Sequence, residues 1–343
     1  MTFICGGRQV PASRFRVDPI AKGLVDIGWN VNKIYGYGDL DQRLSSGLVR
    51  RAYRAGCRLR RAMITGCLKL DEPVVLQRLA WPWSGFPETR LAKRVAGLIF
   101  DFDDAVFLNG AGNISRLRDT ALKSVFSESI HVVAGNSWLA EYASDYADVS
   151  VVPTCIDTSR YLPVDDQETD KKTVIGWVGT SGNFKYLYQL IKPLCDLRSS
   201  GFLFDFVICS DAVDKQLFGQ LGADFVKWTA ENEISVIQSF DIGLMPLHDD
   251  DWCRGKCSFK LIQYASVGLP SVGSAVGFNK DVIEDGTTGY LVAENEWYEP
   301  LSRLVDDHFD RLRMGRNARN VALSRFDVSV AISAYQELLH KIN

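Results

Sequence analysis

Short apolar runs alternate with helical stretches along almost the whole chain, and this alternation constrains the fold more than any other feature. A first series of predicted strands covers residues 31–35, 74–79, 97–102, 130–134 and 149–153. A second series covers residues 174–178, 204–209, 225–228, 242–246, 271–274 and 290–292. Several of these runs are continuously apolar, as in parallel strands that are buried on both faces. The pattern therefore predicts an α/β protein with two parallel sheets.

The stretch 163–172 separates the two series and has the composition of a linker. It begins with proline and is otherwise mostly polar and charged. A length of 343 residues also favours about two domains. We expect an N-terminal Rossmann-like domain over 1–163, a second domain over 164–326 and an amphipathic C-terminal helix over 327–343. Open α/β sheets bind ligands beyond the carboxyl ends of their strands, so we expect the functional residues in those loops.

Composition excludes several classes of protein. The net charge of −3 gives no global basic field, so we expect no nucleic-acid partner. No apolar run approaches the ~18 residues of a membrane span, and no basic segment followed by an apolar one opens the chain. The 8 cysteines form no CxxC pair, which favours free thiols over a metal site. We therefore expect a cytoplasmic protein without a bound metal.

The loop after the predicted strand 174–178 reads GTSGN and carries Gly179, Thr180, Ser181 and Asn183. A glycine-rich turn that opens a helix presents backbone N–H groups and the positive end of the helix dipole, which suit a phosphate. The glycine spacing is GxxGxxG, so a dinucleotide site is not predicted. A tight βα turn without any ligand is the alternative interpretation.

The loop after the predicted strand 242–246 is polar, and we expect a helix from about Lys256 to Val267 to follow it. In such a helix Lys256, Lys260 and Gln263 share one face. Arg254, Lys256 and Lys260 would then gather at a helix start, where the dipole disfavours cations by a few tenths of a kcal/mol. This placement favours an anionic ligand among them, although helical lysines more often only solvate a surface.

Three segments of the second half resemble, in order, glycosyltransferase family 4: IGWVGTSGNFKYL, DIGLMPLHDDDWCRGKCSFKLIQYASVGLPSVGSAVGFN and IEDGTTGYLVA. Shorter matches are MGRNAR with VALSRFD, ASRFRV and LIFDFDDAVF. The family comprises retaining enzymes that use sugar nucleotides, and the likeness is strongest to its bacterial surface-polysaccharide branch. The resemblance implies a GT-B fold, with two Rossmann-like parallel-sheet domains facing across a cleft. It implies no metal and no further cofactor.

The resemblance also implies roles for particular residues. As catalytic residues it indicates Asp103, Asp104 and Lys260. As donor-binding residues it indicates Gly179, Thr180, Ser181, Asn183, Asp249, Arg254, Lys256, Gln263, Gly277 and Asn279. As acceptor-binding residues, in a loop after the first strand, it indicates Gly7, Arg14 and Arg16. Arg14 and Arg16 would hold either a phosphate or a surface carboxylate.

The chain departs from the family pattern at three positions. The family carries two glutamates eight residues apart, and this chain has Gly255 and Gln263 there. Gln263 can still hold a ribose by hydrogen bonding, whereas Gly255 cannot contact the donor sugar. Thr180 replaces a basic residue of the family, so Lys185 or the group of Arg254, Lys256 and Lys260 must neutralise the diphosphate.

The carboxyl end of the predicted strand 97–102 carries Asp101, Asp103 and Asp104. Three hypotheses are open for these carboxylates. They could be the nucleophile and acid of a dehalogenase-type phosphatase, or the metal-binding DxD of a GT-A glycosyltransferase. The resemblance favours an acceptor-facing cluster, in which Asp103 or Asp104 orients or deprotonates the acceptor hydroxyl. Asp104 could also simply cap a helix.

The stretch 43–69 contains no acidic residue and interleaves basic with apolar side chains. A basic amphipathic helix of this kind suits an anionic membrane surface, at about 1 kcal/mol per basic residue. A solvated helix face is the alternative. We therefore add a peripheral position on the inner membrane face to the hypothesis.

Together these observations predict a retaining glycosyltransferase. It would move a sugar from a nucleotide-diphospho-sugar to a saccharide or lipid-linked acceptor in surface polysaccharide synthesis. The alternatives are a GT-B nucleotide-sugar epimerase, a phosphatase that uses Asp101 and Asp103, and a non-catalytic subunit that binds sugar nucleotides.

Overall fold

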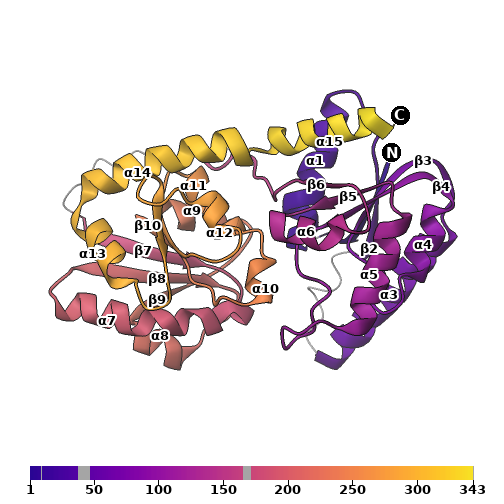
Figure 1. Ribbon diagram of the computed structural model, residues 1–343. Helices are drawn as coiled ribbons and strands as arrows, with labels where there is room; N and C mark the ends of the chain where they lie inside the picture. The colour runs from indigo at the N-terminus through magenta and orange to yellow at the C-terminus, as the bar shows by residue number, and fades with distance from the viewer. Residues whose placement is uncertain (9, 38–46, 165–170, 343) are drawn as a thin grey trace. The chain divides into compact units, whose positions relative to one another are not determined.

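The computed structural model describes residues 1–8, 10–37, 47–164 and 171–342, which form two compact units. Unit 1 comprises Met1–Cys155, Gly255–Cys257 and Val328–Asn343, and unit 2 comprises Ile156–Arg254 and Ser258–Asp327. Each unit is built on a 6-stranded sheet whose paired strands run parallel (Figure 1). Every predicted strand overlaps an observed one, so the prediction of an α/β fold with two parallel sheets is confirmed.

The sheet of unit 1 has the strand order β2-β1-β3-β4-β5-β6. Its strands are β1 (Thr2–Gly7), β2 (Asn32–Tyr37), β3 (Leu70–Gln77), β4 (Val95–Phe102), β5 (His131–Ala134) and β6 (Val149–Val151). Its helices are η1 (Ser13–Val17), α1 (Asp18–Asp26), α3 (Gly47–Cys67), α4 (Phe86–Ala92), α5 (Arg116–Glu128), α6 (Ser137–Ser144) and α15 (Val328–Ile342).

Side-chain alternation in the strands of unit 1 gives the sheet two apolar faces. Phe3 and Val75 belong to a buried cluster with Leu24 of α1 and Tyr335 of α15. On the other face Phe100 packs edge-on against Phe126 of α5, at 5.6 Å between ring centroids. Helices therefore cover both faces, which explains the continuously apolar strands.

The sheet of unit 2 has the strand order β12-β11-β10-β7-β8-β9. Its strands are β7 (Thr173–Val178), β8 (Phe204–Ser210), β9 (Ala223–Lys227), β10 (Ile242–Met245), β11 (Ser271–Ser274) and β12 (Gly289–Val292). The helices in the first part are η2 (Ser181–Leu190), α7 (Ile191–Ser199), α8 (Lys215–Leu221), α9 (Glu233–Gln238) and α10 (Asp251–Arg254). Those in the second part are α11 (Phe259–Ser266), α12 (Asn279–Val282), α13 (Tyr298–Asp306), α14 (His308–Val321) and η3 (Ala322–Phe326).

Both sheets reverse their strand order at one point, and this point locates the binding loops. In unit 1 the order reverses between β1 and β3, and in unit 2 between β7 and β10. The loops at the carboxyl ends of two such strands diverge and leave a crevice, where open α/β sheets bind ligands. The loop after β7 and the loop after β10 are the two that the sequence analysis selected in the second half.

The compact units have different limits from the domains that we predicted. The first unit ends at Cys155 rather than at residue 163, and it includes α15. The reason lies in the packing of α15, which contacts α1 and contributes Ala331, Tyr335 and Leu339 to the buried cluster of Phe3. Part of the predicted linker, 165–170, lies outside the described residues. The domain limits of 1–163, 164–326 and 327–343 stay a prediction.

Close packing in unit 2 generates a first prediction. A Cβ atom at Gly176 of β7 would lie 2.1 Å from the Phe240 ring, whereas one at Gly219 of α8 would meet no heavy atom within 4 Å. We expect Gly176→Ala to lower the free energy of unfolding by about 1–3 kcal/mol through overpacking. Gly219→Ala should leave it unchanged or raise it by up to ~1 kcal/mol through helix propensity. Urea unfolding measures both, and equal effects of the two variants would contradict this packing.

Candidate functional site

In unit 2 the glycine loop and one lysine come together at the reversal of the sheet. Lys260, the second residue of α11, is half-buried and lies across Gly179, where a Cβ atom would be 2.7 Å from the lysine Cε. Its Nζ lies 5.5 Å from the centroid of the Trp177 ring. Two predicted donor-binding elements, the loop after β7 and Lys260, are thus neighbours. The absence of a side chain at Gly179 is what permits this contact.

The predicted helix from about Lys256 is wrong at its start, because α11 begins at Phe259. Ser258 has a φ of 48°, a left-handed conformation that a continuous helix does not allow. Lys256 therefore shares no helix face with Lys260, and it belongs to unit 1. Arg254 ends the separate helix α10 and pairs with Asp249 and Asp251. The three cations do not gather at one helix start.

The loop after β7 already uses several of its polar groups internally. The N–H of Ser181 donates to Oδ1 of Asp211 at 2.7 Å, and the N–H of Asn183 donates to the Thr180 carbonyl at 2.9 Å. The Asn183 amide also donates to Oγ1 of Thr180 at 3.0 Å. The free amides that we expected at Ser181 and Asn183 are thus occupied. A phosphate would have to displace the Asp211 carboxylate to reach the Ser181 amide.

Two of the predicted donor-binding side chains are buried in internal networks. Gln263 is 4% exposed and donates from Nε2 to Glu233, which also accepts from Tyr161 and Trp228. Asn279 is 0% exposed, donates to the Ser274 carbonyl at 2.9 Å and accepts from Ser258 at 2.7 Å.

Gly277 and Asp249 are the remaining predicted donor residues of unit 2. Gly277 has a φ of 50°, and a Cβ atom there would lie 2.8 Å from the Arg254 backbone, so it seats its loop on α10. Asp249 is exposed, and its hydrogen bond from Arg254 holds the pKa of its carboxyl below the usual range. The ribose role of Gln263 and the donor roles of Asn279, Gly277 and Asp249 stay predictions.

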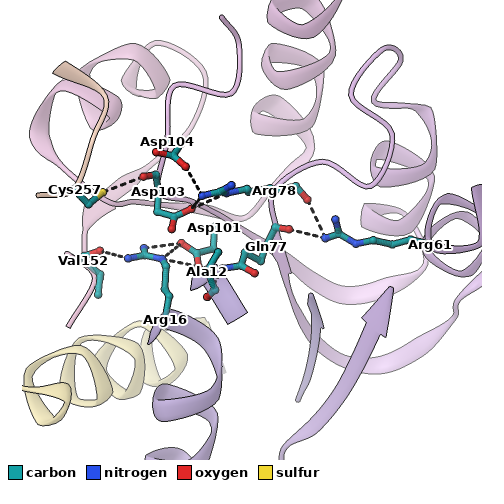
Figure 2. Close-up of polar contacts among 10 residues, drawn as sticks. All are labelled: Ala12, Arg16, Arg61, Gln77, Arg78, Asp101, Asp103, Asp104, Val152 and Cys257. Atoms are coloured by element: carbon teal, nitrogen blue, oxygen red, sulfur yellow. Dashed lines mark hydrogen bonds and ion pairs between the residues drawn. The ribbon is translucent and has the colours of Figure 1, made fainter. Parts of the chain in front are cut away.

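In unit 1 Asp101 is a buried structural carboxylate. Arg16 donates from Nε to both oxygens of Asp101 at 2.8 and 2.9 Å and from Nη2 at 2.6 Å (Figure 2). It also donates from Nη1 to the Val152 carbonyl at 2.7 Å. Burial raises the pKa of Asp101, and the nearby Arg16 opposes this rise. With 1% exposure, Asp101 offers no accessible nucleophile for the phosphatase hypothesis.

Arg16 is therefore not an open acceptor-binding cation, because it is 0% exposed and donates to Asp101 and to the Val152 carbonyl. It lies in the helical turn η1 rather than in the loop that we expected after the first strand. Arg14 of the same turn is half-buried and lies over the Phe15 ring, at 4.9 Å from its centroid. Gly7 is the last residue of β1 rather than part of the loop after it. The acceptor roles of Gly7 and Arg14 stay predictions.

Asp103 and Asp104 share one cation, Arg78, which follows β3. Arg78 donates from Nε to Oδ1 of Asp103 at 2.7 Å and from Nη2 to Oδ2 of Asp104 at 2.6 Å (Figure 2). Burial disfavours the charge of Asp103, but Arg78 and Arg16 outweigh burial and lower the pKa of Asp103. Burial and the charge of Asp103 raise the pKa of Asp104, which Arg78 opposes.

We call residues Gly255–Cys257 the strap, because this piece of the second half belongs to unit 1. The Cys257 thiol donates to the Asp103 carbonyl at 3.1 Å, and Asn136 donates from Nδ2 to the Lys256 carbonyl at 3.0 Å. A Cβ atom at Gly255 would lie 2.6 Å from Cβ of Ala105 and 3.0 Å from its backbone nitrogen. The glutamate of the family pattern would clash here, so the glycine follows from the seating of the strap.

Arg78 is the functional candidate that the sequence analysis missed. The predicted strand ran to Leu79 and therefore included Arg78, whereas β3 ends at Gln77. The available signal was a charged residue that interrupts an apolar run beside a predicted strand end. Across residues 1–8, 10–37, 47–164 and 171–342, no group of three or more His, Cys, Asp or Glu side chains is placed to hold a metal ion.

Helix α3 carries most of the basic stretch that we singled out, although residues 43–46 lie outside the described residues. Arg51, Arg54 and Arg58 are exposed on it, and so are Leu48 at 80% and Met63 at 56%. In the part of the chain that the structure describes, no helix combines the length and the apolar character that crossing a bilayer requires.

Comparison with known sequences places a recognised domain in the second half. Residues 172–307 match the family model described as Glycosyl transferases group 1. A D-inositol 3-phosphate glycosyltransferase of Corynebacterium efficiens is 26% identical over 207 residues, which is 52% of this chain and 47% of that protein. The chain thus spans about half the length of the curated relatives it matches. These matches show a group 1 glycosyltransferase domain, which covers most of unit 2 and includes the strap.

Comparison with solved structures extends over the whole chain. A sucrose-phosphate synthase from Thermosynechococcus elongatus gives a TM-score of 0.75 at 13% identity and covers 99% of this chain and 98% of its own. Anabaena HepE, solved in complex with UDP and glucose, gives 0.70 at 14% identity and covers 99% and 100%. At these identities the likeness establishes the fold, and it confirms the predicted GT-B class.

The buried pair of Arg16 and Asp101 generates a second prediction. Arg16→Met leaves Asp101 charged and uncompensated in the interior, so the free energy of unfolding should fall by about 3–5 kcal/mol. Arg313→Met is the control, because its exposed pair with Asp310 should contribute only about 0–1 kcal/mol. The double variant Arg16→Met with Asp101→Leu should recover part of the loss. Chemical unfolding measures all three, and a harmless Arg16→Met would return Arg16 to the candidate ligand-binding residues.

Proposed function

We propose that the chain is a retaining glycosyltransferase that takes a nucleotide-diphospho-sugar as its donor. The observation that carries the proposal is the contact of Lys260 with Gly179 at the reversal of the sheet, inside the matched glycosyltransferase domain. UDP in the HepE complex supports a uridine nucleotide as the first donor to test. The acceptor is proposed to be a saccharide or a lipid-linked sugar in surface polysaccharide synthesis.

The proposed role of Lys260 is to neutralise the diphosphate as it leaves. Lys260 lies at the N-terminus of α11, where the helix dipole disfavours a cation but favours a phosphate. A bound diphosphate would compensate the lysine and accept hydrogen bonds from the helix start. Such a preformed cationic site stabilises charge that develops on a leaving group, so the mechanism proposed here needs no metal.

The proposed acceptor side is the pair of carboxylates after β4. The side chain of Asp104 is 34% exposed, whereas that of Asp103 is 10% exposed. A carboxylate within hydrogen-bond reach of a hydroxyl can orient it and take its proton. In a retaining reaction this hydroxyl attacks the anomeric carbon from the face that the diphosphate leaves.

The donor site generates a third prediction. Lys260→Ala should raise the Kd for UDP on the order of 10–100-fold, because it removes a charge-assisted hydrogen bond to the diphosphate. Lys192→Ala, at an exposed lysine of α7, is the control and should bind UDP as the wild type does. Thermal shift without metal gives the affinities, and radiolabelled transfer to a membrane extract tests the reaction.

Each result of these two assays has a defined meaning. Unchanged UDP affinity in Lys260→Ala would contradict the proposed phosphate site. Tight UDP binding without transfer would favour the non-catalytic subunit, an alternative that Gly255 in place of the family glutamate supports.

We also propose that unit 1 binds an anionic membrane surface through α3. Leu59 and Met63 are exposed beside the arginines of α3. Phe86, the first residue of α4, and Trp83, just before that helix, are also exposed. The helices α3 and α4 pack together, since a Cβ atom at Gly66 would lie 3.6 Å from Pro87. Basic side chains with apolar and aromatic neighbours suit the headgroup region. A lipid-linked acceptor would be reached from this position.

Vesicle binding provides the fourth prediction. The triple variant Arg51→Gln, Arg54→Gln, Arg58→Gln should weaken binding to vesicles that contain phosphatidylglycerol on the order of 100-fold, at about 1 kcal/mol per basic residue. Arg313→Gln, Arg316→Gln, Arg325→Gln is the control in unit 2, with the same loss of exposed charge. Co-sedimentation with and without phosphatidylglycerol measures the effect. Equal binding of both triple variants would show that α3 is only a solvated face.

A further inference from the structure

Arg78 has a geometry that a simple surface arginine would not adopt. Its guanidinium reaches two carboxylates at once, with Nη2 at 2.6 Å from Oδ1 of Asp103 and at 2.6 Å from Oδ2 of Asp104. A planar guanidinium presents its donors in a fixed fork, so it sets the orientation of both carboxylates together. Lysine cannot reproduce this arrangement.

The backbone at Arg78 is held in an uncommon conformation. Its φ is 56°, a left-handed value that favours glycine or asparagine. The Arg78 N–H donates to the Asp101 carbonyl at 2.8 Å, and Arg61 of α3 donates from Nη2 to the Arg78 carbonyl at 3.2 Å (Figure 2). Strained residues of this kind persist where the surrounding structure fixes them, and they cluster at functional sites.

The two carboxylates on Arg78 are not equivalent. Asp103 is buried, and its Oδ1 receives two nitrogens of Arg78. Asp104 receives Arg78 on Oδ2, and a third of its side chain is exposed. The charges around Asp103 lower its pKa, while burial and Asp103 raise that of Asp104. Environments that shift the pKa values of two neighbouring carboxyl groups in opposite directions give the two groups different roles.

We propose that Arg78 is a positioning residue, which fixes Asp103 as a structural anion and aims Asp104 at the acceptor hydroxyl. This inference rests on the proposed transfer function. The hydroxyl proton moves to Asp104 as the hydroxyl oxygen bonds to the anomeric carbon. The bond from that carbon to the diphosphate breaks, and its electron pair leaves with the diphosphate. Asp104 then releases the proton to water.

The test must take account of every charge around the pair. The charged and titratable groups that face Asp103 and Asp104 are Arg16, Arg78, Asp101, Lys256, Cys257 and Tyr335. Of these, Arg78 is the one that bridges both carboxylates. A base must be ionised to accept a proton, and a neighbouring cation lowers the pKa of a carboxyl. Loss of Arg78 should therefore move the acidic limb of the pH profile of kcat/KM to higher pH.

Arg78→Gly is the decisive variant, because glycine suits a φ of 56°, so the variant removes the guanidinium without straining the backbone. We expect kcat/KM to fall on the order of 100-fold, with the acidic limb moved upward by about 1–3 pH units. Arg78→Lys keeps the charge but loses the fork, so both changes should be smaller. Asn295→Gly, at an exposed residue of unit 2 with a φ of 72°, is the backbone control and should change neither.

NMR titration of the aspartate carboxyl carbons gives a second readout that does not need activity. If Arg78 only braces the fold, Arg78→Gly will lose stability and rate together while the acidic limb of kcat/KM stays where it is in the wild type, which overturns the inference. If the wild type transfers no sugar to any acceptor, the proposed function fails. In that case midpoints of Asp103 and Asp104 that rise in Arg78→Gly still show that Arg78 holds the two carboxylates as anions, and unchanged midpoints reject that pairing.

Discussion

A charged pair buried under the carboxyl end of β4 determines how unit 1 is arranged around its candidate site. Asp101 ends an otherwise apolar strand, and only a cation with good geometry compensates a carboxylate at that depth. Arg16 provides this from η1 and also binds the carbonyl of Val152, just after β6. One side chain thus joins three parts of the unit. The neighbouring carboxylates Asp103 and Asp104 share a second cation, Arg78.

In unit 2 the loops of the candidate site are held in place by close packing at glycines, whereas in unit 1 they are held by buried charges. Gly179 lets the aliphatic part of Lys260 cross the loop after β7, and Gly277 lets the next loop rest on the backbone of Arg254. Both contacts bring main chain close to the start of α11 and the end of α10. The loops at the reversal of the sheet are therefore held by steric fit, while the cation stays partly accessible.

The sequence predicted the fold well and the site in part, for physical reasons. Parallel strands that are covered on both faces leave continuous apolar runs, which are local signals, so every strand except β1 lay in one of the two predicted series. The start of α11 was missed because Ser258 turns left-handed, and serine carries no signal for that conformation. Arg16 and Gln263 were expected to contact ligands, but their partners Asp101 and Glu233 lie far away in the chain. A contact between residues so far apart in the sequence leaves no signal in the local sequence pattern.

The composition of unit 1 from separate pieces has a consequence for how the protein is made. Its sheet comes from the first part of the chain, and its strap lies in the sequence between the two pieces of unit 2. Its helix α15 follows unit 2 in the sequence. During synthesis Phe3 and Val75 emerge early, but the helix that covers them emerges only after all of unit 2. Until α15 is made, this face of the sheet in the nascent first half is covered by α1 but not by α15. Unit 2, whose residues Ile156–Arg254 and Ser258–Asp327 precede α15, is in a position to mature before unit 1 is complete.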